Sequence, residues 1–285
     1  MKNNMTNKNI TNFDFSSFYH KHKAYLPNSL EPSIDFLCWF VGFTEGEGSF
    51  IVNNRGDLCF VIVQSTSDIK ILYYIKETLG FGKVISQSLS TSRFVTQNKK
   101  EIEIIISIFN GNLILPSRKI KLYTFIEAFN KWASKGRIIL DIIQFKDTFI
   151  LPSLDNYWLT GFVDGEGCFT CSILDKKGFS FNFNISQKGE INKVILEQLC
   201  KLFNSGKVSE HFYKGIYEYR ISGVKACANT FHYFDKFTLL TKKSLSYILW
   251  KEVHKDLLEK NHLIFEKRLK MIEKTRIINN NKKCK

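Results

Sequence analysis

Apolar residues along this chain recur every second position in some stretches and every third or fourth position in others. The first spacing is typical of strands with one buried face, and the second of amphipathic helices. Residues 60–63 are β-branched or aromatic and follow turn-forming residues at 54–56, which predicts a hairpin. Farther on, Ile71, Leu72, Ile75 and Leu79 recur with helical spacing after Ser67 or Asp68 as a cap. A helix therefore follows the hairpin.

The same succession of elements is predicted in both halves of the chain. The first half is expected to form helix 34–46, strands 48–54 and 58–65, helix 67–79, strands 82–88 and 92–97, and helices 99–109 and 117–133. The second half is expected to form helix 154–165, strands 168–174 and 179–187, helix 190–203, strands 206–212 and 217–222, and helices 224–235 and 241–260. Each half is predicted to be an α+β unit with a four-stranded antiparallel sheet covered by helices.

The two halves open on nearly the same string of residues. The copies are Phe40-Val41-Gly42-Phe43-Thr44-Glu45-Gly46-Glu47-Gly48 and Leu159-Thr160-Gly161-Phe162-Val163-Asp164-Gly165-Glu166-Gly167. Each copy reads as an apolar helix that ends in acid-Gly-Glu-Gly and runs straight into a strand. The two glutamates, Glu47 and Glu166, are 119 residues apart, and later equivalent positions are 123 or 124 apart. This internal repeat fixes the architecture before any detail is considered.

The repeated string resembles the signature of the LAGLIDADG homing endonucleases, and both copies keep the glycines and both acids. The resemblance runs from about residue 34 to about residue 270. It implies two pseudo-symmetric repeats that pack through their two motif helices and form a saddle over DNA. The expected division is a polar N-terminal extension at 1–33, a first repeat at 34–136, a linker at 137–153, a second repeat at 154–270, and a basic tail at 271–285.

The acids at the helix ends are the candidate chemistry. A carboxylate at a helix C-terminus faces the negative end of the dipole, and two such carboxylates close together need a neutralising cation. Oxygen ligands with spare water positions suit Mg²⁺. The resemblance implies that Glu47 and Glu166 bind the divalent metal, together with the carbonyls of Gly46 and Gly165. The remaining motif residues are expected at the interface between the helices: Gly42, Glu45, Gly161 and Asp164. Capping or a simple ion pair is the alternative for the glutamates.

Two further pairs occur at matching intervals. Gln64 and Gln187 end the second strand of each repeat, where the family holds a polar residue that orders water. A strand-end residue that merely faces solvent is an equal alternative for these glutamines. Lys119 and Lys243 begin the last helix of each repeat and resemble the family's charge-stabilising lysine. Their sequence neighbours, Arg118 and Lys242, are the alternative partners.

The charge of the chain indicates a polyanionic partner. Lys and Arg number 41 against 27 Asp and Glu, which gives a net charge of +14. Such a balance favours nucleic acid through release of counterions. Cationic side chains on or next to the strands are the candidates for contacts with DNA phosphates or bases, although each is more often a solvated surface charge: Arg55, Lys83, Arg93, Lys176, Lys207 and Arg220.

Other classes of protein are disfavoured. Seven cysteines at irregular spacing suggest reduced thiols, and the Cys-x-x-Cys at 168–171 has no second pair to complete a zinc site. No apolar run approaches the roughly 20 residues of a membrane span. Residues 1–33 fit neither a secretory signal nor an Arg-rich transit peptide. The bias toward Phe, Ile, Asn and Lys suggests A+T-rich coding, as in a mitochondrial gene; a chloroplast gene or a bacterial one is the alternative.

The sequence therefore predicts a monomeric, intron-encoded DNA endonuclease. It is expected to use Mg²⁺ to make a staggered double-strand cut with 3′ overhangs at a long, asymmetric site. The main alternative is an RNA maturase on the same fold that helps its host intron RNA to splice. A DNA-binding regulator on a decayed nuclease scaffold is a third reading, less consistent with two retained acids. Gly215 to Tyr217 and Lys260 to His262 lack the rest of the GIY-YIG and HNH nuclease motifs.

Overall fold

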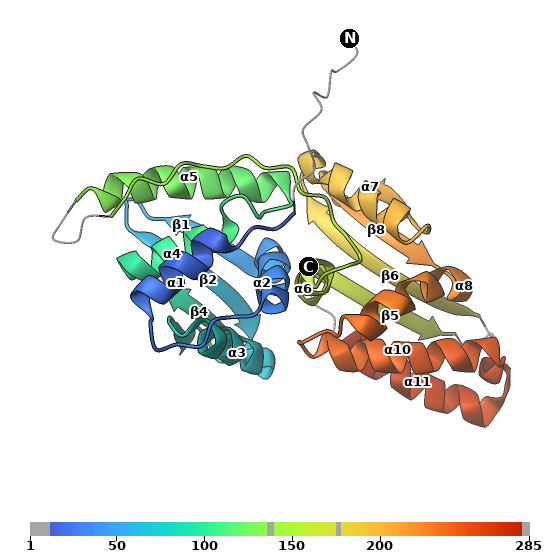
Figure 1. The fold of residues 1–285 in the computed structure, drawn as a ribbon. Helices are drawn as coiled ribbons and strands as arrows, with labels where there is room; N and C mark the ends of the chain where they lie inside the picture. The colour runs from blue at the N-terminus through green and yellow to red at the C-terminus, as the bar shows by residue number, and fades with distance from the viewer. Residues whose placement is uncertain (1–11, 136–139, 175–177, 281–285) are drawn as a thin grey trace, which may run out of the picture. The chain divides into compact units, whose positions relative to one another are not determined.

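Two four-stranded antiparallel sheets organise the chain, one in each half, as Figure 1 shows. The computed structural model describes residues 12–135, 140–174 and 178–280. It divides into two compact units, Met1–Pro152 and Ser153–Lys285. The strand orders are β1-β2-β4-β3 and β5-β6-β8-β7. The strands are β1 Gly48–Val52, β2 Leu58–Ser65, β3 Lys83–Ser86, β4 Thr91–Thr96, β5 Gly167–Ile173, β6 Phe179–Lys188, β7 Lys207–Glu210 and β8 Ile216–Ser222. The predicted α+β class is confirmed.

The helices also follow the repeat. The first unit contains α1 Ser16–Tyr25, α2 Ile34–Glu47, α3 Ile69–Leu79, α4 Lys99–Phe109 and α5 Pro116–Ala133. The second contains α6 Trp158–Glu166, α7 Lys193–Leu202, α8 Val224–Cys227, α9 Phe231–Lys236, α10 Lys243–Leu258 and α11 Phe265–Asn280. Helix 224–235, predicted as continuous, is interrupted by a 3-10 turn at Ala228–Thr230. The predicted helices otherwise match within about four residues at their ends.

Aromatic side chains fill the space between each sheet and its helices. In the first unit, Phe50 and Phe60 face the helices, and both rings contact Phe109 of α4. In the second unit, Phe181 stacks on Trp250 of α10, with ring centroids 4.3 Å apart. Because side chains alternate along a strand, these contacts identify the helix-covered face of each sheet. The residues between them along the strands point to the opposite face, which we call the open face.

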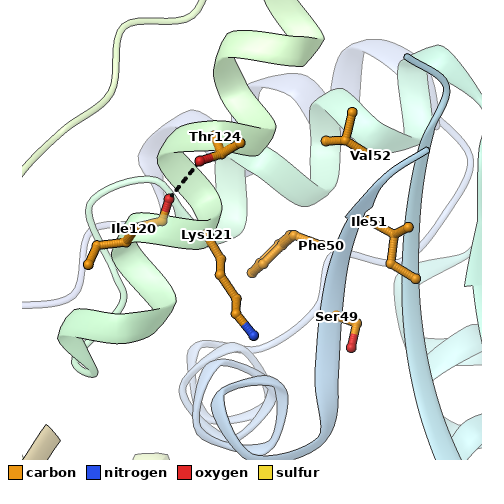
Figure 2. Close-up of a pocket in the computed structure, with 7 residues that line it drawn as sticks. All are labelled: Ser49, Phe50, Ile51, Val52, Ile120, Lys121 and Thr124. Carbon is orange, nitrogen blue, oxygen red and sulfur yellow. Dashed lines mark hydrogen bonds between the residues drawn. The ribbon is translucent and has the colours of Figure 1, made fainter. Parts of the chain in front are cut away.

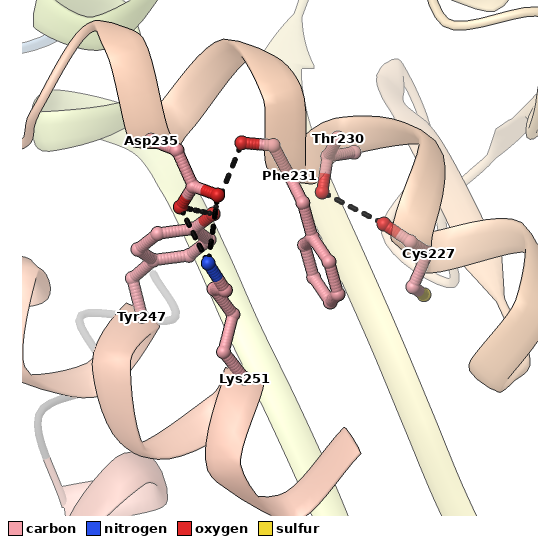
Figure 3. A network of polar contacts seen from close by, with 6 residues as sticks. All are labelled: Cys227, Thr230, Phe231, Asp235, Tyr247 and Lys251. Carbon is pink, nitrogen blue, oxygen red and sulfur yellow. Dashed lines mark hydrogen bonds and ion pairs between the residues drawn. The ribbon is translucent and has the colours of Figure 1, made fainter. Parts of the chain in front are cut away.

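Polar contacts tie α9 to α10 at the rim of the second core (Figure 3). Lys251 Nζ lies 2.7 Å from both carboxylate oxygens of Asp235, and the Tyr247 hydroxyl lies 2.8 Å from Asp235 Oδ1. Burial, together with the Asp235 carboxylate, raises the pKa of Tyr247. The phenol therefore stays protonated and donates to Asp235. This network orients α10, whose first residue, Lys243, belongs to the candidate site.

A glycine makes the junction between motif helix and strand in each unit. A side chain at Gly48 would place its Cβ 2.8 Å from the Thr44 carbonyl oxygen, and one at Gly167 would place it 2.9 Å from Val163 Cα. Both glycines adopt extended dihedral angles, so close approach rather than a left-handed conformation requires them. The chain can therefore pass from helix to strand without a loop, and the final glutamate of the helix lies directly beside the sheet.

Two helices were not predicted from the pattern. α1 forms inside the polar N-terminal extension and packs on α4, where Lys21 and Tyr25 bind the buried Glu103 carboxylate. α11 packs on α10 and on the edge strand β5, and its Asn279 amide donates to the Cys171 carbonyl oxygen at 2.8 Å. Within residues 12–135, 140–174 and 178–280, no helix has the length and apolar character needed to cross a bilayer.

Candidate active site and nucleic-acid face

Each motif helix ends on the glutamate that the sequence singled out. Glu47 is the last residue of α2 and Glu166 the last residue of α6, and both side chains are half-buried. Gly42 and Gly161 lie buried in the middle of these helices. The role of the glycines in helix pairing stays a prediction. The half-buried glutamates are the motif acids that a substrate or a cation can reach.

The first acid of each motif is buried and binds backbone amides within its own unit. Glu45 Oε1 accepts hydrogen bonds from the amides of Ile114 and Leu115, at 2.8 and 2.6 Å. Asp164 accepts from the amides of Leu240 and Thr241, at 2.9 and 3.1 Å. Each carboxylate therefore fastens the loop that leads into α5 in the first unit or α10 in the second. Their predicted place between the motif helices stays untested beside this local role.

A basic side chain reaches the C-terminal end of each motif helix. In the first unit, Arg118 donates to the carbonyl oxygens of Glu45, Gly46 and Gly48, at 2.7, 2.9 and 2.9 Å. In the second, Lys243 Nζ donates to those of Val163 and Gly165, both at 2.9 Å. A cation here offsets the negative end of the helix dipole.

Lys119 makes a different contact from its presumed equivalent. Its Nζ lies 2.6 Å from the Thr148 carbonyl oxygen, in the stretch that leads toward the second unit. By contact with the motif helix, the structural counterpart of Lys243 is Arg118, which the sequence offered only as an alternative. Arg118 thus precedes by one position the residue that equal spacing matches to Lys243. The acid at the same place also differs, because Glu45 is replaced by the shorter Asp164, which binds the amides of Leu240 and Thr241.

The donor chemistry at each helix end fits a hard divalent cation. A glutamate carboxylate stands one residue after a backbone carbonyl, and both are oxygen donors. The Gly46 and Gly165 carbonyls already accept from Arg118 and Lys243, and a carbonyl oxygen has a second lone pair. In the described part of the chain, no three Asp, Glu, His or Cys side chains gather as a cation site. Each helix end therefore supplies only part of a coordination shell.

The two glutamines are placed alike. Gln64 lies in β2 and Gln187 in β6, on the helix-covered side by alternation, with exposed fractions of 3% and 8%. Neither glutamine is therefore a strand-end residue whose amide simply faces solvent. Both are buried polar groups on the second strand of their sheet, which packs beside the motif helix.

The predicted DNA-contacting residues fall on the strands or their turns. Lys83 and Arg93 lie on the open face of the first sheet, and Lys207 and Arg220 are paired on the open face of the second. Arg55 is exposed in the turn between β1 and β2. Lys176 lies outside the described residues. Glu218 was not among the predicted residues. Its carboxylate accepts hydrogen bonds from Arg220 Nε at 2.7 Å and from the Asn184 amide at 3.1 Å.

A groove of about 440 Å³ lies between β1 and α5 (Figure 2). Its lining residues are Ser49, Phe50, Ile51, Val52, Ile120, Lys121 and Thr124. One cation and two hydroxyls among apolar side chains offer no pair of groups for acid–base catalysis. The candidate chemistry therefore stays at the ends of the motif helices.

Known proteins share both the repeat and the fold. The family model described as LAGLIDADG endonuclease matches residues 40–129 and again 159–254. "Probable intron-encoded endonuclease 4" of Neurospora crassa is 37% identical over 234 residues, which are 80% of this chain and 41% of that protein. The chain thus spans about two-fifths of the length of this relative.

Solved structures share the fold across nearly the whole chain. The I-LtrWI LAGLIDADG homing endonuclease bound to target DNA superposes with a TM-score of 0.72, at 22% identity, covering 88% of this chain and 100% of that one. I-SmaMI, bound to an uncleaved DNA target in the presence of calcium ions, gives 0.67 at 20% identity, covering 85% and 98%. Two motif copies, each matched by the family model and each opening a four-stranded α+β unit, place this chain in the LAGLIDADG endonuclease family.

Proposed function

We propose that this chain is a metal-dependent, site-specific DNA endonuclease that cuts both strands of a long, asymmetric target and leaves 3′ overhangs. One observation carries the proposal. Both units end the motif helix on a half-buried glutamate, directly after a glycine whose carbonyl oxygen accepts a hydrogen bond from a cationic side chain. The family membership and the net charge of +14 support duplex DNA as the partner.

Glu47 and Glu166, with the Gly46 and Gly165 carbonyls, would hold the divalent cations. We propose Mg²⁺, because the donors are all oxygen and leave room for water and phosphate ligands. When bound, such a cation polarises the scissile phosphate and activates a water molecule. Arg118 and Lys243 position the carbonyls and add positive charge where the phosphate becomes more negative. Gln64 and Gln187 would orient water, and Lys119 would contribute indirectly by fixing residues 140–152.

Each helix end would act on one strand of the duplex. We also propose that the chain works as a monomer, because one chain already contains two motif helices. An intron-encoded origin fits the relative's name, and we propose a mitochondrial location on the A+T-rich coding bias.

The test uses the purified full chain, Mg²⁺ and a plasmid that carries the intron-free junction of its own gene. The wild type is expected to linearise the plasmid, and Glu47→Gln and Glu166→Gln are each expected to abolish or strongly slow the double-strand cut. Glu127→Gln and Glu273→Gln are matched controls, because both glutamates are exposed on helices away from the motif ends. Full activity in both motif variants would refute the metal assignment.

The same protein can be tested with RNA. If the wild type leaves the duplex whole but accelerates splicing of the intron transcript, the maturase function replaces the endonuclease. If the wild type binds DNA but neither cuts it nor accelerates splicing, the chain is a DNA-binding regulator on this scaffold.

A further inference from the structure

The open faces of the two sheets differ in chemistry although their backbones correspond. On the first sheet, the open face carries an apolar stripe: Ile51, Cys59, Val61, Val63, Ile85 and Val95. The corresponding ladder positions on the second sheet hold Thr170, Asn182, Asn184, Ser186, Ser209 and Arg220. Six apolar positions on the first sheet thus correspond to six polar positions on the second.

The apolar stripe is not part of the core of its unit. The core lies on the other face, where Phe50 and Phe60 meet the helices. Ile51 and Ile85 remain 42% and 37% exposed, and Val63 and Val95 are half-buried. Only Val61 is enclosed by its neighbours, at 4%. Two exposed and two half-buried β-branched side chains on one face favour contact with a partner over contact with water.

Cationic side chains on the same face specify the partner as an anion with apolar groups. Arg93 lies between Val63 and Ile85 in the strand ladder, and Lys83 pairs with Val95. Arg93 Nε is buried and has no hydrogen-bond partner among the described residues. The Arg93 side chain as a whole is only half-buried, so the accessible part of its guanidinium can donate to a phosphate or a guanine edge. The major groove of DNA offers phosphates, guanine edges and the methyl groups of thymine together.

The second sheet presents the opposite arrangement. Glu218 accepts from Asn184 and from Arg220, so that these side chains form a connected polar row. Fixed amide and guanidinium groups suit hydrogen-bond readout of purine edges, with arginine to guanine and asparagine to adenine. Apolar side chains recognise instead the C5-methyl group that distinguishes thymine.

We propose that the first unit reads its half of the target largely through thymine methyl groups, which contact the stripe of Ile51, Val63, Ile85 and Val95. The second unit reads its half through hydrogen bonds from Asn184 and Arg220. The inference rests on the proposed endonuclease function, and adds which bases each half-site contains. The half-site of the first unit is richer in thymine at the positions under the open face.

The test begins with selection of binding sequences by the full chain from a pool of randomised duplexes, with Ca²⁺ in place of Mg²⁺. Each thymine of the selected site is then replaced by deoxyuridine, which lacks only the methyl group. Binding is expected to weaken about fourfold for each contacted methyl group lost. The loss is expected in one half-site and not in the other.

Two protein variants assign the sensitive half. Val63→Thr and Val95→Thr keep side-chain shape and strand propensity but replace one methyl group by a hydroxyl. They are expected to reduce the deoxyuridine effect in the sensitive half, whereas Ser186→Ala, at the position that corresponds to Val63, leaves it unchanged. The deoxyuridine series uses wild-type protein, so it decides the question even if a variant folds poorly.

Three results would overturn the inference. They are binding that tolerates deoxyuridine throughout, equal loss in both halves, or a sensitive half that responds to Asn184→Ala instead of the valine variants. If such a protein still cuts its site, the proposed function stands without the inference. A protein that binds no duplex at all would remove both.

Discussion

The motif helices of the two units show how one arrangement can be held by different residues. Arg118 is the third residue of α5 and reaches three carbonyl oxygens at the end of α2, whereas Lys243 is the first residue of α10 and reaches two at the end of α6. The matching acids also differ, since Glu45 is one methylene longer than Asp164. A change in acid length, a shifted helix start and a changed cation therefore occur together at the same place in the two units.

The edges of the two sheets differ as well. α11 covers the edge strand β5, while the equivalent strand β1 leaves Ile51 and Val52 exposed beside the groove of Figure 2. As a result the equivalent phenylalanines, Phe50 and Phe169, have different surroundings. Phe169 is 2% exposed and its ring contacts Phe183, Phe234, Tyr247 and Trp250. Phe50 is half-buried and lines the groove.

The largest expected effect on stability comes from this pair. Phe169→Ala should destabilise the second unit by about 3–5 kcal/mol, since it leaves a cavity among four aromatic rings. Phe50→Ala should cost less, because part of its ring already contacts water. Amide hydrogen exchange of peptides from each unit measures the two effects separately. Equal loss of protection in the two variants would show that the open groove and the covered edge are energetically equivalent.

The next effect is on cleavage and concerns the two cations. Arg118→Ala and Lys243→Ala should each slow the cut of one strand by about 100-fold, because a positioned donor is lost beside the phosphate. A nicked plasmid should therefore accumulate with either variant. The comparison variant is Lys119→Ala, which removes a contact with the Thr148 carbonyl oxygen and is expected to slow the cut less than Arg118→Ala. If Lys119→Ala nicks as Arg118→Ala does, the assignment of Arg118 as the counterpart of Lys243 is wrong.

A smaller effect is expected from the buried acids. Replacing either by its amide should cost about 1–3 kcal/mol through loss of charge-assisted hydrogen bonds. Asp164→Asn should cost more than Glu45→Gln. The Leu240 and Thr241 amides contact different oxygens of Asp164, so an asparagine must turn its NH2 group toward one of them. The two amides at Glu45 share Oε1, which a glutamine can match. Urea unfolding followed at both units measures the order, and the reverse order would contradict this reading.

Sequence periodicity predicted most of the fold because the strands and helices of each unit bury one continuous apolar face. It missed α1 and α11 for a physical reason. The buried residues of α11 are only Met271, Thr275 and Ile278 amid charged residues, so the helix forms because β5 and α10 offer it a surface. No local pattern records such a surface.

The candidate site was predictable in part. The repeated string located Glu47 and Glu166 at the helix ends, because a glycine that permits a direct helix-to-strand junction leaves a sequence signal. Equal spacing selected Lys119, and Arg118, which the sequence offered as the alternative, is the residue whose guanidinium contacts the end of α2. Spacing along the chain cannot resolve which of two adjacent cations points at a helix end, since neighbouring residues on a helix diverge by about 100°.

The smallest expected effect is a pH dependence confined to the second unit. Burial lowers the pKa of His254, and this effect is larger than the opposite effect of the hydrogen bond to the Val224 carbonyl. The charge of Lys251 lowers the pKa further. The equivalent residue of the first unit is Asn130, whose amide donates to the Ile143 carbonyl at 2.9 Å and does not titrate. As pH falls below about 6.5, the unfolded chain takes up a proton at this histidine before the folded chain does. Stability of the second unit therefore decreases toward the lower pKa of the folded state. His254→Asn should remove this slope while keeping a donor, and hydrogen exchange between pH 7 and pH 5 measures it; an unchanged slope in the variant would assign the acid sensitivity to other groups.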